Sequence, residues 1–515
     1  MIYQIYPRSF MDASGNGVGD LAGITSKLDY IRALGIDAIW LSPFYPSPMA
    51  DFGYDVSDYT GVHELFGTMG DFDELLAEAH ERGLKLIIDW VPNHTSDQHP
   101  WFVESRSSRN NPKRDWYVWR DGAPDGGPPN NWLAAFRRAG RAWSFDDTTD
   151  QWYLHSFLAE QPDLNWDNPE VEAAMHETLR FWLDRGVDGF RIDVAHKIGK
   201  DPGLADNPPD VEEFTALDPM RRHDEDWPSV HQRLAAIRRV TDGYPDRLTV
   251  GEVYILDLER LMDYVNAPDG LHLAHNFVFL HQPWDADAFR KLLEGMEELR
   301  SPEAWAAWFL NNHDHSRVAT RYGPRAVRAA AMLVLTLRGT PFLFQGEELG
   351  LPDAPVSPDQ EVDVDGRDPE RAPIPWEPPS AGGPGAGFTS GVPWLPITPD
   401  AELLNAATQA EDACSTLSFY RRLIGLRKDT DCLKSGSFEL LSSDKDVLAY
   451  VRGEGEHRML VVLNFSPTEV CFGGALAGLQ GAARIALSTD PASRRGEVDL
   501  REVSLGAGEG LILQL

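Results

Sequence analysis

The chain has 515 residues, of which 42% are hydrophobic and 25% are charged. This composition is typical of a globular, soluble protein, and the length predicts two or three domains, one of them large. The formal net charge is −34, from 81 acidic and 47 basic residues, which excludes nucleic acid and anionic membrane surfaces as partners because both are bound by clustered Lys and Arg. A neutral substrate is compatible with this charge.

The cysteines and the hydropathy indicate where the protein works. Its three cysteines, Cys414, Cys432 and Cys471, come late in the chain and lack the spacing of metal ligands, which favours a reducing compartment without a disulfide framework. No apolar run reaches the roughly 18 residues of a membrane span. Because Met1 leads directly into a predicted strand without a signal peptide, we expect a cytoplasmic protein, either a monomer or a homodimer.

Strands and helices alternate along most of the chain. Each predicted strand is a continuous apolar run, which is typical of a parallel sheet covered on both faces. About eight such strands fit a closed (β/α)8 TIM barrel. The predicted strands are 2–6, 36–43, 84–91, 187–193, 248–253, 306–311 and 340–345, and the predicted helices are 21–34, 70–82, 169–185, 227–241, 324–338 and 415–429.

Breaks in this alternation predict three domains. The barrel is assigned to residues 1–94 and 165–433, and the stretch 95–164, rich in aromatic residues, Asn, Asp, Gly and Pro, is predicted to form an inserted irregular domain after the third strand. From residue 434 onward, short apolar runs separated by Gly, Ser and Asp predict an antiparallel β-sandwich that extends to residue 515.

The loop after the first strand has the composition of a cation site. Oxygen-bearing residues alternate there with small ones, and the alternative interpretation is a Gly-rich turn that caps the helix beginning near Leu21. Side-chain oxygens and one backbone carbonyl in this spacing suit a hard cation, Ca²⁺ or Mg²⁺. The candidate ligands are Asp12, Ser14, Asn16, the carbonyl of Val18, and Asp20.

Polar side chains follow five of the predicted strands. In a parallel barrel the carboxyl ends of the strands open onto one face, where active sites lie. Any one of these groups has a structural interpretation, and the pair Arg191 and Asp193 alone reads equally well as a buried ion pair. The strand-end groups are Asp89 to His94, Arg191 with Asp193 and His196, Glu252, Asn311 to Asp314, and Gln345 to Glu348.

Carboxylates at the ends of three strands favour glycosyl transfer or hydrolysis. Their mutual repulsion must be offset, which makes a purely structural role improbable, and no Ser-His-Asp motif, phosphate-binding loop or dinucleotide fingerprint competes with this interpretation. We expect Asp193 to be ionised, with Arg191 lowering its pKa, and Glu252 to keep a proton for the leaving oxygen. Asp314 would bind sugar hydroxyls, helped by His94 and His313.

Four segments resemble the motif regions of the α-amylase superfamily, glycoside hydrolase family 13, in the family's order. They are Asp89-Trp90-Val91-Pro92-Asn93-His94, Gly189 to His196, Gly251-Glu252-Val253 and Asn312-His313-Asp314. The resemblance implies a (β/α)8 barrel with an inserted domain and a C-terminal β-domain. It also implies that Asp193 is the nucleophile, Glu252 the general acid/base and Asp314 the transition-state stabiliser of a retaining mechanism that needs no cofactor.

Two further segments resemble oligo-1,6-glucosidases and related α-glucosidases. Gln161-Pro162-Asp163-Leu164-Asn165 matches their typical motif, and Ala50 to Asp55 matches the loop that closes the pocket around the non-reducing end. By this match Asp51 hydrogen-bonds the terminal glucose, Tyr54 stacks on it, Phe157 forms an aromatic wall, and Arg371 pairs with Asp51.

The same resemblance gives weaker expectations for Val194 and His196, which both follow the expected nucleophile in the sequence. Val194 stands where the family has Val in α-1,6-specific members and a smaller or polar residue in α-1,4-specific ones, and His196 matches a Lys or His on the acceptor side. In the cation loop, Ser14 and Asn16 stand where Asn and Asp are usual, so the ligand set has one carboxylate fewer.

Three functions stay open at this stage. The main prediction is an exo-acting α-glucosidase for short neutral maltose- or isomaltose-type oligosaccharides, with some transglucosylation. The second is a sucrose- or trehalose-acting isomerase or hydrolase of the same fold, although Arg317 is followed by Val-Ala-Thr-Arg-Tyr and not by an isomerase signature rich in Arg and Asp. The third is a non-catalytic carbohydrate-binding homologue, which would lack a catalytic carboxylate and carry a membrane span.

Overall fold

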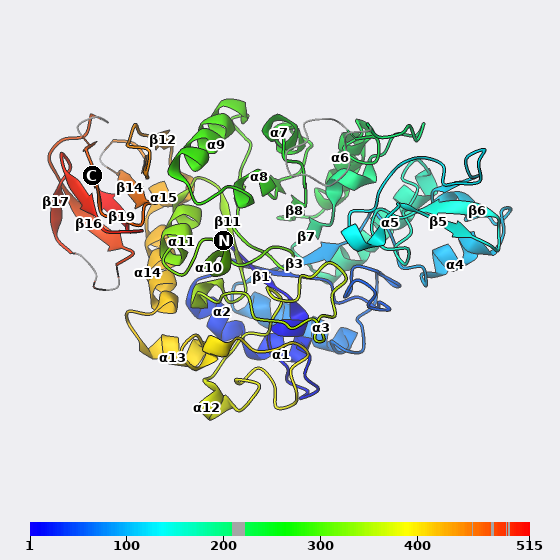
Figure 1. Cartoon of the computed structure of the whole chain (residues 1–515), viewed down its shortest axis with the longest axis horizontal. Coiled ribbons are helices and arrows are strands. Elements are labelled where there is room, and N and C mark those ends of the chain that lie inside the picture. Colours follow the sequence, from blue (N-terminus) through cyan, green and yellow to red (C-terminus); the bar gives the residue numbers. More distant parts are fainter. Residues whose placement is uncertain (209–221, 456, 475–477, 491, 493–494) are drawn as a thin grey trace. The chain divides into compact units, whose positions relative to one another are not determined.

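The computed structural model describes residues 1–208, 222–455, 457–474, 478–490, 492 and 495–515. The chain divides into two compact units, and Figure 1 labels the helices and strands along the whole chain. Unit 1 comprises 1–38, 276–360 and 367–515, and unit 2 comprises 39–275 and 361–366. We describe each unit by itself.

The parallel sheet of unit 2 aligns the strands that carry most of the candidate site. Its strands follow the order β2-β3-β7-β8-β9, and the register pairs Asp89 with Arg191 and Ile192 with Gly251. Nearly every residue of these strands is buried, as expected of apolar runs covered on both faces. The strands are β2 (Ala38–Leu41), β3 (Lys85–Trp90), β7 (Gly189–Ile192), β8 (Leu248–Gly251) and β9 (Leu273–Ala274).

Local sequence signals set the ends of the helices in unit 2. Thr68 and Asp71 form a reciprocal capping box at the start of one helix. Asn168 caps a longer helix, which begins with Pro169 and is followed by Gly186 in the left-handed region, with φ 107°. These helices are α3 (Met69–Glu81) and α5 (Pro169–Arg185), and the unit also holds α4 (Pro100–Ser107), α6 (Ser229–Thr241) and α7 (Leu258–Asn266).

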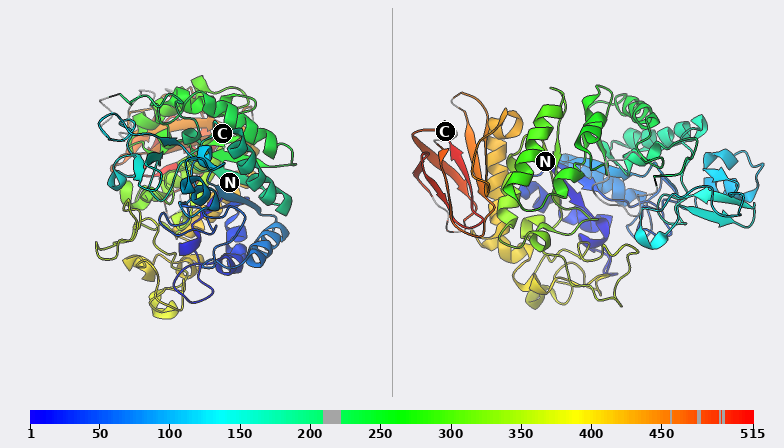
Figure 2. Two further views of the ribbon diagram at one scale, coloured as in Figure 1. Left: turned by 90° about the vertical axis from the view of Figure 1, so that its right-hand side faces the viewer. Right: turned by 45° about the horizontal axis from the view of Figure 1, so that its top comes forward.

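The segment predicted as an insertion contains a small antiparallel sheet in the order β4-β6-β5 (Figure 2). Its core is aromatic: Phe102 of α4 stacks on Trp119 with ring centroids 5.6 Å apart and nearly parallel planes, and Trp132 is fully buried. The strands are β4 (Trp119–Arg120), β5 (Trp143–Asp146) and β6 (Gln151–Leu154).

Unit 1 contributes three parallel strands in the order β10-β11-β1. The helix predicted over 21–34 is two helices, because the chain leaves helical geometry at Lys27, with φ −109° and ψ 6°. The elements are β1 (Ile2–Ile5), β10 (Ala307–Trp308), β11 (Thr340–Phe344), α1 (Leu21–Ser26), α2 (Leu28–Leu34), α8 (Phe277–Leu280), α9 (Ala286–Leu299), α10 (Val318–Arg321), α11 (Val327–Thr336), α12 (Pro379–Gly382), α13 (Ala406–Glu411), α14 (Thr416–Asp429) and α15 (Asp431–Ser435).

The end of unit 1 is an antiparallel β-domain, drawn in orange and red in Figure 1. A six-stranded sheet, β12-β13-β14-β19-β16-β17, and a two-stranded sheet, β15-β18, share one apolar core that includes Val462, Phe472 and Leu505. The strands are β12 (Phe438–Leu440), β13 (Val447–Arg452), β14 (Met459–Asn464), β15 (Val470–Phe472), β16 (Ala482–Ser488), β17 (Glu497–Asp499), β18 (Val503–Leu505) and β19 (Gly510–Gln514).

Eight parallel strands alternating with helices, followed by an antiparallel domain, confirm the predicted fold class. One strand of the eight was missed: β9 has only two strand residues, Leu273 and Ala274, too few to give a recognisable apolar run. The proposed boundaries at 94/95, 164/165 and 433/434 stay predictions.

A buried carboxyl in unit 1 predicts a pH-dependent stability. Burial raises the pKa of Glu347 to about 7, although its oxygens accept hydrogen bonds from Tyr420 Oη and the Phe344 amide. The unfolded chain loses this proton near the ordinary value of 4.5, so the stability that the protonated group contributes is lost as the pH rises through about 7. Glu347→Gln is neutral at every pH. Its free energy of unfolding relative to wild type should therefore be about 2 kcal/mol higher at pH 8.5 than at pH 5.5.

Thermal unfolding at the two pH values measures this gain. The exposed Glu439→Gln, in the same unit, is the matched control and should follow wild type. A Tm difference between Glu347→Gln and wild type that is equal at both pH values would contradict the account.

Candidate active site

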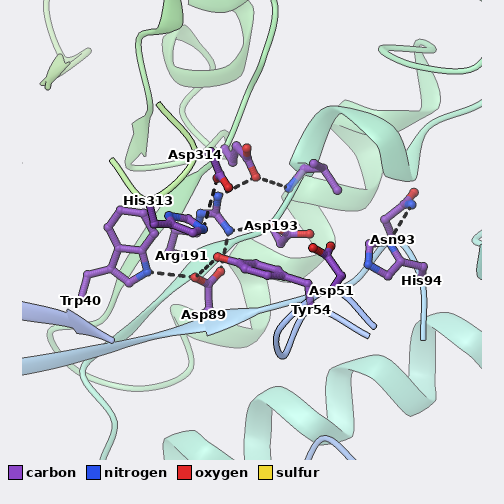
Figure 3. A network of polar contacts seen from close by, with 12 residues as sticks. Trp40, Asp51, Tyr54, Asp89, Asn93, His94, Arg191, Asp193, His313 and Asp314 are labelled. Atoms are coloured by element: carbon purple, nitrogen blue, oxygen red, sulfur yellow. Dashed lines mark hydrogen bonds and ion pairs between the residues drawn. The ribbon is translucent and has the colours of Figure 1, made fainter. Parts of the chain in front are cut away.

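One buried guanidinium joins the polar ends of three strands in unit 2. Arg191 Nη1 donates to Asp89 Oδ1 and to Asp193 Oδ1, each at 2.7 Å, and Nη2 donates to Glu252 Oε2 at 2.6 Å (Figure 3). Arg191 is 1% exposed, and the indole of Trp40 lies under its guanidinium, 5.1 Å from the ring centroid. The predicted ion pair is therefore one arm of a cluster in which three carboxyl groups share a single positive charge.

The charge balance of this cluster differs from the expected one. Burial is the largest influence and raises the pKa of Asp193 well above its ordinary value; Arg191 lowers it, while the neighbouring Glu252 and Asp89 raise it again. Burial likewise raises the pKa of Asp89 to about 6. Arg191 lowers the pKa of Asp193, as predicted, but burial and the two neighbouring carboxyl groups outweigh it, so the expected net lowering is wrong: one cation faces three buried carboxyl groups.

The segment after Asp193 turns back onto Glu252. Val194 donates its backbone N–H to Glu252 Oε2 at 3.0 Å and is 8% exposed. His196, predicted on the acceptor side, is 1% exposed, its Nδ1 lies 3.4 Å from the Glu252 carbonyl oxygen, and burial lowers its pKa to about 4. His196 is therefore a neutral, buried neighbour of the Glu252 backbone.

The residues predicted to bind the terminal glucose lie together in unit 2. The Gln161 amide nitrogen donates to Asp51 Oδ2 at 3.0 Å and lies 3.1 Å from His94 Nε2. Phe157 packs on His94 with ring centroids 5.2 Å apart, and Tyr54 donates its hydroxyl to Asp89 Oδ2 at 3.2 Å. Burial lowers the pKa of His94 to about 4, so its imidazole is neutral, which suits a residue expected to lie near developing positive charge.

Two further residues support this group and were not predicted as site residues. Asp163 is fully buried and accepts hydrogen bonds from Ser156 N at 2.8 Å and Asn93 Nδ2 at 3.2 Å. Lys200 Nζ lies 3.0 Å from Asp163 Oδ2 and donates to Asn93 Oδ1 at 2.7 Å. Asp163 lies inside the segment that resembles the oligo-1,6-glucosidase motif, whereas nothing in the sequence around Lys200 marked it.

The remaining candidates lie in unit 1 and form a cluster of their own. Asp314 Oδ1 accepts from Arg371 Nη2 at 2.8 Å and from Arg367 Nη1 at 3.1 Å, and Asp314 Oδ2 lies 3.2 Å from His313 Nε2. Burial alone would raise the pKa of Asp314, but these three neighbours outweigh it and lower the pKa below its ordinary value. His313 stacks on Tyr6 with ring centroids 5.8 Å apart. Arg367 was missed, and the pairing of Arg371 with Asp51 stays a prediction.

The loop predicted to hold a cation has internal hydrogen-bond donors. Asp12 accepts from the backbone amides of Gly15 and Gly17, both at 2.7 Å, and from Thr389 Oγ1 at 2.5 Å. Asp20 caps the helix α1 by accepting from Gly23 N at 2.7 Å. Across the described part of the chain, no three His, Cys, Asp or Glu side chains cluster as metal ligands. The two carboxylates expected to bind a cation thus accept these hydrogen bonds, and the cation stays a prediction.

Known proteins with similar sequences agree with one another in the kind of enzyme that their names state. Residues 4–436 match the alpha amylase catalytic domain. A probable alpha-glucosidase of Rhizobium meliloti (strain 1021) is 43% identical over 90% of this chain and 88% of its own length. An oligo-1,6-glucosidase of Parageobacillus thermoglucosidasius is 38% identical over 90% of each chain.

Solved structures match this chain over its full length. The alpha-glucosyl transfer enzyme XgtA has a TM-score of 0.92 and 40% identity, covering 100% of this chain and 98% of its own. The trehalulose synthase MutB from Pseudomonas mesoacidophila MX-45 has a TM-score of 0.92 and 35% identity over the same shares. In the described residues, no helix is long and apolar enough to cross a bilayer. The family model and these relatives together show that the chain belongs to the α-amylase family of glycoside hydrolases.

Proposed function

We propose that the protein is an exo-acting, retaining α-glucosidase that removes the terminal non-reducing glucose from short neutral oligosaccharides, with some transglucosylation. The observation that carries the proposal is the buried cluster in which Arg191 binds Asp89, Asp193 and Glu252 at 2.6–2.7 Å. It supplies the two carboxyl groups that retention needs, one to attack and one to carry a proton.

The shared charge supports a division of labour between the two carboxyl groups. In this division Glu252 protonates the glycosidic oxygen while Asp193, which reacts in its ionised form, attacks C1 from the opposite face and forms a β-glucosyl ester. Glu252 then takes a proton from water, or from a sugar hydroxyl in transglucosylation, and the incoming oxygen displaces Asp193. Two inversions at C1 give net retention.

Asp314 has the third role by its resemblance to the family motif. Its arginine and histidine neighbours lower its pKa, so it stays ionised and can accept hydrogen bonds from sugar hydroxyls throughout the cycle. A permanently charged carboxylate suits electrostatic stabilisation of an oxocarbenium-like transition state.

The contacts of Asp51 support recognition of one glucose at a closed end. Gln161 orients the Asp51 carboxylate by donating to Oδ2, and it lies beside the neutral imidazole of His94. A carboxylate and a histidine held in this way present fixed acceptors and donors to sugar hydroxyls. With Val194 after the nucleophile, we propose that α-1,6 linkages are cleaved at least as fast as α-1,4 linkages.

A sucrose-acting isomerase is the second candidate, favoured by the similarity to the trehalulose synthase. It would use the same carboxyl groups but return the glucosyl unit to the fructose released from sucrose. The non-catalytic alternative is disfavoured because Asp193, Glu252 and Asp314 are all present in the motif positions.

Product analysis with maltose, isomaltose, sucrose and trehalose separates these functions. We expect free glucose from isomaltose and maltose, with isomaltose cleaved at an equal or higher rate. Rearranged disaccharides from sucrose, with little free glucose from the other sugars, would select the isomerase. No glucose from any of the four would contradict the proposed function.

A further inference from the structure

The residue after the proposed nucleophile has a strained backbone. Val194 has φ 33° and ψ 49°, in the left-handed region. A β-branched side chain crowds the backbone there, so Val in this region is rarely observed and must be held by its surroundings. Such strain persists only where neighbouring contacts hold the conformation, so the contacts of the Val194 peptide must stabilise it.

The segment from Ile192 to Ala195 forms hydrogen bonds with both the backbone and the side chain of Glu252. The Glu252 amide donates to the Ile192 carbonyl at 2.8 Å, and the Ala195 amide donates to the Glu252 carbonyl at 2.9 Å. Between these two bonds, the Val194 amide donates to Glu252 Oε2 at 3.0 Å. The left-handed turn at Val194 is what allows consecutive amides to reach the side chain and then the backbone of one residue.

These contacts make the two oxygens of the Glu252 carboxyl group unequal. Oε2 accepts two N–H donors, Val194 N at 3.0 Å and Arg191 Nη2 at 2.6 Å. A proton on Oε2 would face these donors and would have to displace one of them, leaving a buried donor unpaired. Oε1 is therefore the oxygen on which a proton costs least.

We propose that the strained Val194 peptide is a positioning clamp that reserves Oε2 of Glu252 as an acceptor, so that Oε1 carries the proton delivered to the leaving oxygen. The inference rests on the proposed function, in which Glu252 is the general acid. Val194 acts through its backbone, so the clamp is separate from any effect of the Val side chain on linkage.

Glycine and alanine at position 194 separate backbone from side chain. Both remove the Val methyl groups, but only Gly relaxes the left-handed backbone, so Val194→Gly loosens the amide on Oε2 while Val194→Ala keeps it. Asp246, exposed, with φ 56°, gives the matched control Asp246→Gly, which relaxes a left-handed residue outside the site.

The readout is kcat/KM for the preferred disaccharide and for 4-nitrophenyl α-glucoside, whose leaving group needs little protonation. We expect Val194→Gly to lower kcat/KM about tenfold for the disaccharide and less than about threefold for the aryl glucoside. Val194→Ala should show no leaving-group dependence, whatever its overall loss, and Asp246→Gly should stay within about twofold of wild type for both substrates. The Tm of Val194→Gly should be no lower than that of Val194→Ala, because both variants lose the buried Val methyl groups and only glycine adopts this backbone without strain.

Three results would overturn the clamp. They are equal losses for both substrates in Val194→Gly, the same leaving-group dependence in Val194→Ala, and a Tm of Val194→Gly below that of Val194→Ala. Failure of the proposed function looks different, because wild type would then cleave neither substrate. Failure of the acid assignment alone would leave wild type active, but Glu252→Gln would lose activity equally for both substrates.

Discussion

Replacing Asp193 by Asn is expected to lower kcat by at least about 10⁴-fold, because an amide can neither attack C1 nor leave from a glucosyl ester. The substitution keeps the shape of the side chain, and Arg191 keeps its contacts with Asp89 and Glu252, so the fold should persist. Steady-state kinetics with the preferred disaccharide, together with the Tm, measure both effects. Turnover near the wild-type rate would show that another group is the nucleophile.

Rescue by azide distinguishes the nucleophile from the acid/base residue. Asp193→Ala leaves room for azide on the face opposite the leaving group, so one displacement should give β-glucosyl azide. Glu252→Ala should instead let azide attack the β-glucosyl ester on Asp193 and give α-glucosyl azide. The opposite pair of anomers would exchange the two assignments.

Replacing Arg191 by Lys should lower kcat/KM by about 10³-fold. Arg191 reaches three carboxyl groups through two nitrogens, and the single ammonium of Lys cannot reproduce that planar fork. Arg191 lowers the pKa of Asp193 against the effect of burial, so weakening this contact should raise that pKa further. The ionised nucleophile then appears only at higher pH, and the acid limb of the kcat/KM profile should move upward.

A matched pair of variants separates this electrostatic role from simple loss of an ion pair. Arg191→Met leaves three buried carboxyl groups without a counter-charge and should cost about 3–5 kcal/mol of stability. Arg185→Lys, at a partly exposed surface pair with Asp73, should change neither stability nor the pH profile measurably. An acid limb that stays in place in Arg191→Lys would contradict the shared-charge account.

The sequence predicted the parts of the site that follow long apolar strands. Asp89, Arg191 and Glu252 come at the ends of buried runs, and the parallel register brings the first two side by side. Composition and strand order therefore sufficed to predict the fold class and the set of strand-end side chains that includes Asp89 and Glu252. The contacts of Gln161 and Asp51 depended on the resemblance to a family motif, since no periodicity joins residues 110 positions apart.

The residues that were missed lie where the sequence carries no periodic signal. Arg367 binds Asp314 from a long loop, and Lys200 reaches Asp163 after a short helical turn. The charge balance was mispredicted for a related reason: a two-residue spacing reveals the pair Arg191 and Asp193, whereas the competing Asp89 and Glu252 arrive from other strands. Only the three-dimensional structure shows that three carboxyl groups share the one guanidinium.

The most direct test of the retaining mechanism is to trap its covalent intermediate. A 5-fluoro glucosyl fluoride should form the ester quickly and release it slowly, because the ring fluorine destabilises both transition states while the good leaving group speeds only the first step. Mass spectrometry of the digested enzyme should then find one fluoroglucosyl unit on the peptide that contains Asp193. A label on any other residue, or time-dependent inactivation without a label, would contradict the account.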